Sequence, residues 1–207
     1  MQIAVDQLVL DLMREFNTSK AVVYNTVQLY LVDGNHRLQQ MHELAIKTGF
    51  FLGLKLVRGA YMEKERKIAH KYGLPSPICF SKAETDKSFN TAMHYCIKHL
   101  ANIAIVLGSH NEVSMIQAIE IMDQYEIAHN DHRVWFSQLL GMSDHISFVL
   151  ADKGYNVVKF VPFGPMDELI PYFARRAEEN TAMAGQTSRE LMRLRRELKR
   201  RALTNER

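Results

Sequence analysis

Apolar, β-branched runs alternate along this chain with longer segments in which apolar residues recur at helical spacing. Short continuous apolar runs predict buried strands, and the helical spacing predicts amphipathic helices. The expected strands are residues 21–26, 51–57, 103–107, 133–136 and 157–161. The expected helices are residues 1–16, 35–48, 62–72, 85–100, 112–125, 144–153, 167–180 and 188–202. This alternation predicts a parallel sheet covered by helices.

Two α/β architectures fit such a sheet, an open doubly wound sheet and a (β/α)8 barrel. No Gly-x-Gly-x-x-Gly follows an expected strand, which argues against a dinucleotide site of the doubly wound kind. A barrel gathers the carboxyl ends of its strands into one active-site mouth. Polar residues stand at or just past several of these ends, namely Gln28, Arg58-Gly59, Ser109-His110-Asn111 and Gln138. The pattern therefore favours the barrel, although a complete one has eight strands and about 250 residues.

The composition is that of an ordinary globular domain with a basic end. The chain has 207 residues, of which 47% are hydrophobic and 24% are charged, enough for one substantial core. Eight Lys or Arg residues face three acids within residues 186–207, where leucines recur at helical spacing. We interpret this end as a solvated, docked terminal helix, with attraction to an anionic membrane surface or a partner as the alternative. No motif supports nucleic-acid binding.

The remaining composition excludes several other classes. No apolar run reaches the ~18 residues that span a bilayer, and a signal peptide is not expected. Cys79 and Cys96 stand in no metal or redox spacing, which indicates two reduced thiols in a cytosol-like compartment. No carboxylate or cysteine completes a ligand set with His129 and His132, so no metal site is predicted.

The most informative stretch is Lys55-Leu-Val-Arg58-Gly59-Ala60-Tyr61. It ends an apolar run and is followed at once by a charged helical segment, so it lies at the carboxyl end of a buried strand. The guanidinium offers a fixed positive fork, and glycine lets a ligand approach the backbone closely. Alone, the stretch indicates an anion or a ring near a strand end.

Six segments in chain order carry a more specific resemblance. They are Val23-Tyr-Asn-Thr-Val-Gln28, Lys55-Leu-Val-Arg58-Gly59-Ala60-Tyr61, Gly108-Ser-His110-Asn111, Gln138-Leu-Leu-Gly141-Met142, Val161-Pro162-Phe-Gly164 and Tyr172-Phe-Ala-Arg175-Arg176-Ala-Glu-Glu179-Asn180. Together they resemble the proline dehydrogenase family, which implies an α/β fold with a distorted (β/α)8 barrel of TIM type. About five C-terminal βα units plus the terminal helix of about residues 188–202 are expected here, in a single domain over residues 1–207.

The resemblance also implies a reaction and its partners. The family oxidises L-proline to Δ1-pyrroline-5-carboxylate, the first step of proline catabolism. FAD accepts the hydride, and a membrane quinone then takes the electrons. The cofactor supplies the redox chemistry, and the protein positions the substrate and tunes the flavin. A cytoplasmic location, with possible peripheral contact at the inner membrane, follows as an expectation.

The resemblance assigns five residues to the substrate. Arg175 and Arg176 match the pair that binds the proline carboxylate, a group that guanidinium forks recognise well. Adjacent helical residues point ~100° apart, so the two cannot share one ligand symmetrically on a regular helix. Tyr61 matches a tyrosine that closes over the proline ring, and Leu139 and Phe160 match the pocket wall.

The resemblance assigns a second set of residues to FAD. Gln28 matches a flavin-bonding glutamine, and Arg58 matches a basic side chain near the flavin or pyrophosphate, where a positive charge stabilises the reduced flavin. Glu179 matches a carboxylate that bonds a ribose hydroxyl; a surface ion pair between Arg175 and Glu179 is the simpler alternative. The full set is Gln28, Lys55, Arg58, Gly59, Ser109, His110, Asn111 and Glu179.

Two departures from the family pattern keep alternatives open. Phe160 stands where many members carry a tyrosine, so the pocket could accept a substituted ring such as hydroxyproline. The family's active-site lysine and aspartate belong to earlier strands, so we expect this chain to work with an N-terminal part of the barrel. An inactive or regulatory remnant of the fold, or an unrelated (β/α) enzyme acting on another small carboxylate, are the competing hypotheses.

Overall fold

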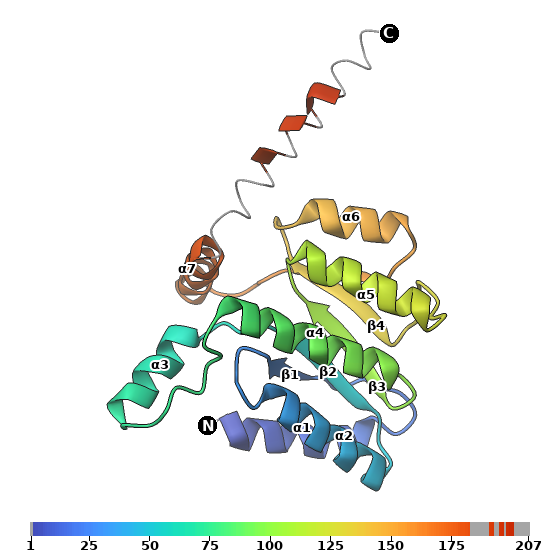
Figure 1. The fold of residues 1–207 in the computed structure, drawn as a ribbon, viewed down its shortest axis with the longest axis vertical. Coiled ribbons are helices and arrows are strands. Elements are labelled where there is room, and N and C mark those ends of the chain that lie inside the picture. Colours follow the sequence, from blue (N-terminus) through green and yellow to red (C-terminus); the bar gives the residue numbers. More distant parts are fainter. Residues whose placement is uncertain (1, 183–190, 193–194, 197, 201–207) are drawn as a thin grey trace. The chain divides into compact units, whose positions relative to one another are not determined.

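The chain folds around one parallel sheet with helices between its strands. The computed structural model describes residues 2–182, 191–192, 195–196 and 198–200 (Figure 1). They form two compact units, Met1–Phe160 and Val161–Arg207, and each is described by itself. The sheet strands are β1 (Asn25–Gln28), β2 (Leu52–Val57), β3 (Ile103–Gly108), β4 (Val134–Leu139) and β5 (Val157–Phe160). The helices are α1 (Gln2–Phe16), α2 (Gly34–Thr48), α3 (Met62–Lys71), α4 (Lys82–Lys98), α5 (Glu112–Gln124), α6 (Asp144–Asp152) and, in the second unit, α7 (Met166–Ala182).

The strand order decides between the two architectures. The five strands pair in parallel in the sequential order β1-β2-β3-β4-β5. A doubly wound sheet reverses its strand order at a switch point, whereas the wall of a (β/α)8 barrel adds each strand beside the last. The sheet is therefore five consecutive βα units of the barrel type, as the sequence predicts.

Up to α7, the observed elements have bounds within three residues of the expected ones, except that the first strand begins four residues late. Residues 21–26 are expected to form that strand, but β1 begins only at Asn25. The buried side chain of Asn17 bonds the backbone there instead: it accepts from the N–H groups of Val22 and Val23 and donates to the carbonyls of Val23 and Phe51. Of the expected helix 188–202, residues 191–192, 195–196 and 198–200 are helical, and the rest lies outside the described residues.

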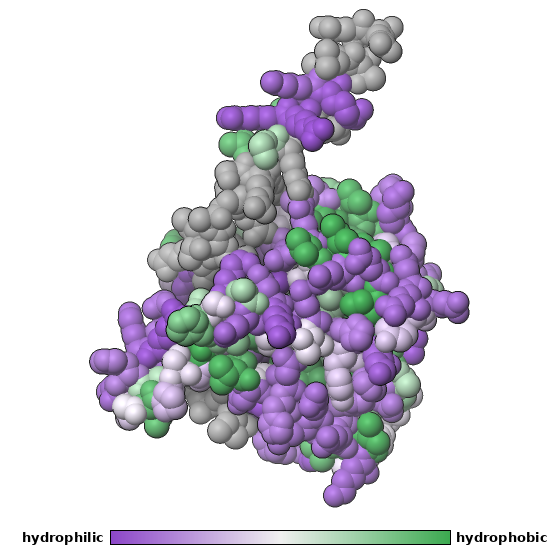
Figure 2. Space-filling model, in the orientation of Figure 1, coloured by the Kyte–Doolittle hydropathy of each residue, from purple (hydrophilic) through white to green (hydrophobic). Residues whose placement is uncertain are grey.

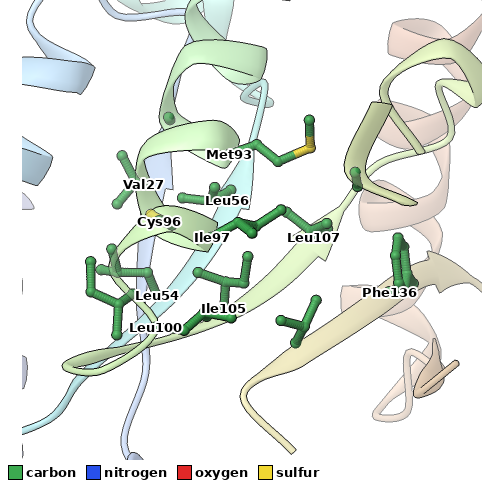
Figure 3. Close-up of a cluster of buried hydrophobic side chains, with 14 of the residues drawn as sticks. Val27, Leu54, Leu56, Met93, Cys96, Ile97, Leu100, Ile105, Leu107 and Phe136 are labelled. Carbon is green, nitrogen blue, oxygen red and sulfur yellow. The ribbon is translucent and has the colours of Figure 1, made fainter. Parts of the chain in front are cut away.

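The core lies between the sheet and its covering helices. α4 presents Met93, Cys96 and Ile97 to side chains of β2 and β3 such as Leu54, Leu56, Ile105 and Leu107, and Leu100 joins them just past the end of the helix (Figure 3). Each such side chain contributes about 1.5–3 kcal/mol when fully buried. Both cysteines are free and buried, and burial raises the pKa of the Cys96 thiol.

The described part of the surface is mostly polar on the face that Figure 2 shows. Over α4 and α5, the face seen in Figure 2 is largely hydrophilic with apolar groups between. Among the residues that the structure describes, none of the helices is both long and apolar enough to cross a bilayer.

Candidate functional site

The sheet has a second face, which carries four of the predicted site residues at its carboxyl edge. Pairing aligns Gln28 with Val57 in the next strand, and Leu139 with Phe160. Side chains two residues apart in a strand share a face, so Lys55 lies on the same face as Val57. The Lys55 ammonium lies 5.2 Å from the centroid of the Phe160 ring. Gln28, Lys55, Leu139 and Phe160 are thus brought to one edge of one face.

Two of these groups are poised to interact with a ligand. The Oε1 atom of Gln28 is buried and accepts no hydrogen bond within the described part of the chain. A buried acceptor without a donor is costly, and a ligand N–H or O–H would satisfy it. Lys55 is partly buried, and this burial lowers the pKa of its side chain. The edge therefore offers an unused acceptor and a partly desolvated cation above apolar walls.

Gly59 has a packing reason to be glycine. Its φ of +129° is one that other residues rarely adopt, and a Cβ there would lie 1.3 Å from Cδ1 of the Tyr30 ring. Tyr30 is buried, and its backbone N–H donates to the Arg58 carbonyl over 2.6 Å. The ring of Tyr30 therefore fixes the path of the chain just after β2.

The Arg58 guanidinium is bound within the protein through all three of its nitrogens. Nε donates to Asp86 Oδ1 over 2.6 Å, Nη1 to Ser109 Oγ over 2.7 Å and Nη2 to Ser114 Oγ over 2.8 Å. Its carbon lies 4.4 Å from the centroid of the Phe89 ring, a cation–π arrangement. Burial lowers the pKa of Arg58, an effect that Asp86 opposes.

The turn at residues 109–111 joins β3 to α5. The position of Asn111 directly before Glu112 predicts a helix cap, and its side chain caps α5 by accepting from the Ser114 N–H over 3.2 Å. His110 Nδ1 lies 3.0 Å from Ser143 Oγ. Burial, aided by the positive charge of Lys159, lowers the pKa of His110 to about 4. The imidazole is therefore neutral at pH 7 and acts here as a hydrogen-bonding group rather than a cation.

Between β4 and α6, the sequence Ser143-Asp144 predicts a helix cap that the structure does not form. Ser143 stands at the start of α6, but it has a positive φ of 52° and makes no capping bond, because its hydroxyl pairs with His110. Lys159 fastens the turn by donating to the Met142 carbonyl and to Asp144 Oδ1, each over 2.7 Å. Gln138 lies inside β4 rather than past its end. Its amide is buried, accepts from Ser147 and donates to the Ser109 carbonyl, so it braces the fold instead of facing the mouth.

The other predicted residues lie apart from this edge or in the second unit. Tyr61 stands just before α3 and is 44% exposed. In α7, Arg175 is exposed, and Arg176 is partly buried with its guanidinium carbon 5.4 Å from the centroid of the Tyr172 ring. Glu179 belongs to α7, but its side chain lies outside the described part of the chain.

Sequence reasoning missed the residues that support the edge. Asp86, Ser114, Ser143 and Lys159 hold Arg58, His110 and the adjoining turns, yet each reads in the sequence as an ordinary helix or strand residue. The partners that they hold lie 15 to 56 residues away, a distance that leaves no periodic pattern. No cluster of three or more potential metal ligands occurs among the described residues.

The chain is similar to known proteins of one family. The family model described as proline dehydrogenase matches residues 2–189. Human mitochondrial proline dehydrogenase 1 is 40% identical over 206 residues, which is 98% of this chain and 34% of the human protein. Hydroxyproline dehydrogenase of Xenopus laevis is 36% identical over 96% of this chain and 43% of its own length.

A solved structure agrees with the fold. Proline utilization A from Bdellovibrio bacteriovorus, inactivated by N-propargylglycine, superposes with a TM-score of 0.79 at 27% identity, covering 86% of this chain and 18% of that one. This chain spans about a third of the length of the human relative. The family model covers most of the chain, and the parallel βα units agree with it. The chain belongs to the proline dehydrogenase family.

Proposed function

We propose that this chain carries part of the active site of a proline dehydrogenase, which oxidises L-proline to Δ1-pyrroline-5-carboxylate as the first step of proline catabolism. One observation carries the proposal beyond family membership. Gln28, Lys55, Leu139 and Phe160 come from four different strands, yet all lie on one face at the carboxyl edge of the sheet. In barrels of this type, that edge is where active sites are built.

The cofactor of the proposed reaction is FAD, and the edge fits it chemically. FAD, when bound, supplies the hydride acceptor. A flavin ring offers an N–H donor, and the buried Oε1 of Gln28 is an acceptor without a donor in the described residues. Lys55 adds a cation, and neutral His110 with Ser109 and Asn111 adds hydrogen-bonding groups for the ribityl and phosphate region. Gly59 and Arg58 shape the strand end between them, and Glu179 is the proposed ribose contact.

The substrate needs an apolar wall for its ring and cations for its carboxylate. Leu139 and Phe160 are paired across β4 and β5, and the Phe160 ring is 44% exposed. They form the proposed wall, and Tyr61 is the proposed cover of the ring. Arg175 and Arg176 are the proposed carboxylate ligands because guanidinium groups bind carboxylates bidentately.

Further βα units complete the site in this proposal. In the described part of the chain, β1 and β5 each pair with a single strand, so the sheet has two open edges. α1, which packs beside β1, exposes Val5, Leu8, Leu12 and Phe16 at helical spacing. An apolar stripe beside an open strand edge suits a preceding βα unit, which would bring the family's lysine and aspartate.

The proposed electron acceptor is a membrane quinone, reached by peripheral contact from the cytoplasm at the inner membrane. Basic residues near the end of the chain support this, since Arg195, Arg196 and Lys199 are exposed and helical. Lys and Arg near an anionic surface contribute about 1 kcal/mol each.

A second candidate substrate is hydroxyproline. Phe160 lacks the hydroxyl that many family members place there, and the Xenopus laevis relative is a hydroxyproline dehydrogenase. The substituted ring would then meet an apolar wall rather than a hydrogen-bonding one.

The test joins this chain to the three preceding βα units of a related proline dehydrogenase and compares the joined protein with the chain alone. The proposal predicts bound FAD and L-proline-dependent reduction of a quinone analogue only in the joined protein. 4-Hydroxyproline is assayed in parallel to rank the two substrates. Bound FAD without turnover of either substrate would support an inactive remnant, and full activity of the chain alone would refute the need for further units.

A further inference from the structure

Asp86 carries a role that the family assignment does not explain. It lies in the first turns of α4, and it accepts from Arg58 Nε over 2.6 Å and also from Lys82. The Arg58 side chain is 14% exposed and that of Asp86 is 27% exposed, so the pair is largely shielded from water. Burial alone would raise the pKa of Asp86, but Lys82 and Arg58 outweigh it and hold that pKa below its usual range.

The pair changes what Arg58 can offer to a ligand. The Asp86 carboxylate, which Lys82 shares, lies 2.6 Å from the guanidinium and offsets part of its charge toward a ligand. All three nitrogens already donate to protein oxygens, and one flat face is covered by Phe89. Arg58 therefore acts on the surrounding residues through the fixed geometry of its guanidinium rather than through its charge.

The fork holds the turn that we propose as a cofactor contact. Arg58 Nη1 donates to Ser109 Oγ, which also accepts from the Asn111 N–H over 3.1 Å. Nη2 donates to Ser114 Oγ in the first turn of α5, and that hydroxyl donates onward to Asn90 Oδ1 over 2.7 Å. Both ends of the turn at residues 109–111 are thus tied to α4 through one guanidinium.

We propose that Asp86 is a positioning residue for the cofactor site, which fixes the Arg58 fork and through it holds the turn at residues 109–111 in place for FAD. This inference rests on the proposed function and deepens it. It makes a prediction opposite in sign to the simpler idea that Arg58 serves as a free positive charge. If charge were the role, removing Asp86 would leave Arg58 more positive and would tighten binding of the anionic cofactor.

The first experiment needs no cofactor. Hydrogen exchange is measured by mass spectrometry across residues 108–116 of the ligand-free chain, in the wild type, in Asp86→Asn and in Asp131→Asn. Asp131 is a matched control, because it also holds an arginine through Nε and Nη2, but at the opposite end of the sheet. We expect about tenfold faster exchange in Asp86→Asn alone, the factor that one weakened charge-assisted bond gives. Unchanged exchange in Asp86→Asn would overturn the proposal.

The second experiment measures FAD affinity in the joined protein used to test the function. Asp86→Asn should weaken FAD binding about tenfold, and Arg58→Lys, which keeps the charge but loses the fork, should weaken it at least as much. Tighter or equal binding in Asp86→Asn, or full rescue by lysine, would overturn the positioning role. A wild-type protein that binds no FAD would refute the proposed function and the cofactor role with it, while the exchange result still decides whether Asp86 holds the turn.

Discussion

Truncating the side chain of Asn17 should be one of the most destabilising single substitutions in this chain. Its side chain is fully buried and makes four hydrogen bonds of 2.8–2.9 Å with the backbone of residues 22, 23 and 51. Asn17→Ala removes all four and leaves four backbone groups without partners. At about 1 kcal/mol net per bond, the free energy of unfolding should fall by about 4 kcal/mol. That is a large fraction of the ~5–15 kcal/mol typical of a domain.

Urea unfolding followed by circular dichroism measures this change. Asn17→Asp replaces the donating N–H groups by an oxygen that faces the Val23 and Phe51 carbonyls in a fully buried site, so its loss at neutral pH should be at least as large as that of Asn17→Ala. Asn130→Ala, at an exposed position, should stay within about 0.5 kcal/mol of the wild type. A loss below about 1 kcal/mol in Asn17→Ala would refute the reasoning that this amide stands in for a sheet partner before β1.

Four further predictions concern the carboxyl edge. The pKa of His110 is lowered from 6.5 to about 4 in the folded chain, so the unfolded chain binds more protons between these two pH values. The free energy of unfolding therefore falls as the pH drops from 6.5 to about 4. His110→Gln should make this fall smaller when the free energy of unfolding is measured by urea titration at several pH values. Burial is the main cause of this pKa shift and the charge of Lys159 adds to it, so Lys159→Met should raise the pKa of His110 in an NMR titration, and an unmoved pKa would contradict the contribution of Lys159. Gly59→Ala should destabilise the fold by several kcal/mol. The same substitution should cost less in a Tyr30→Ala background, which removes the clash but not the backbone strain, and an equal cost in both backgrounds would argue against the packing account. Phe160→Tyr should raise the preference for proline over 4-hydroxyproline about 2- to 10-fold in kcat/KM, the range of one hydrogen bond, and an unchanged ratio would exclude Phe160 from the pocket wall.

The sequence predicts the sheet well where burial is continuous. The strands expected at residues 51–57 and 103–107 agree with β2 and β3 within one residue, because both are central strands with apolar side chains on the helix-facing side. The Asn111 cap was also predictable, since capping depends on a residue and its next turn. Local sequence patterns thus suffice to predict elements that are fully buried or that are stabilised by residues close in the sequence.

Tertiary pairing decides the features that the sequence does not reveal. The first strand starts late because Asn17, far back in the chain, bonds the segment that propensity assigns to it. Ser143 does not cap α6, because its hydroxyl pairs with His110, which is 33 residues away. The clamp on Arg58 joins residues 28 to 56 positions apart. The spacing between these partners in the sequence follows neither the helical nor the strand repeat, so only the folded structure reveals the pairs.

The central claim is that the carboxyl edge of this sheet, completed by further βα units, binds FAD beside a proline pocket. Anaerobic titration of the joined, FAD-loaded protein with L-proline tests it most directly. The account predicts that L-proline bleaches the flavin absorption band in proportion to the FAD bound. A flavin band that stays unchanged at saturating L-proline, in a protein that retains its FAD, would contradict it.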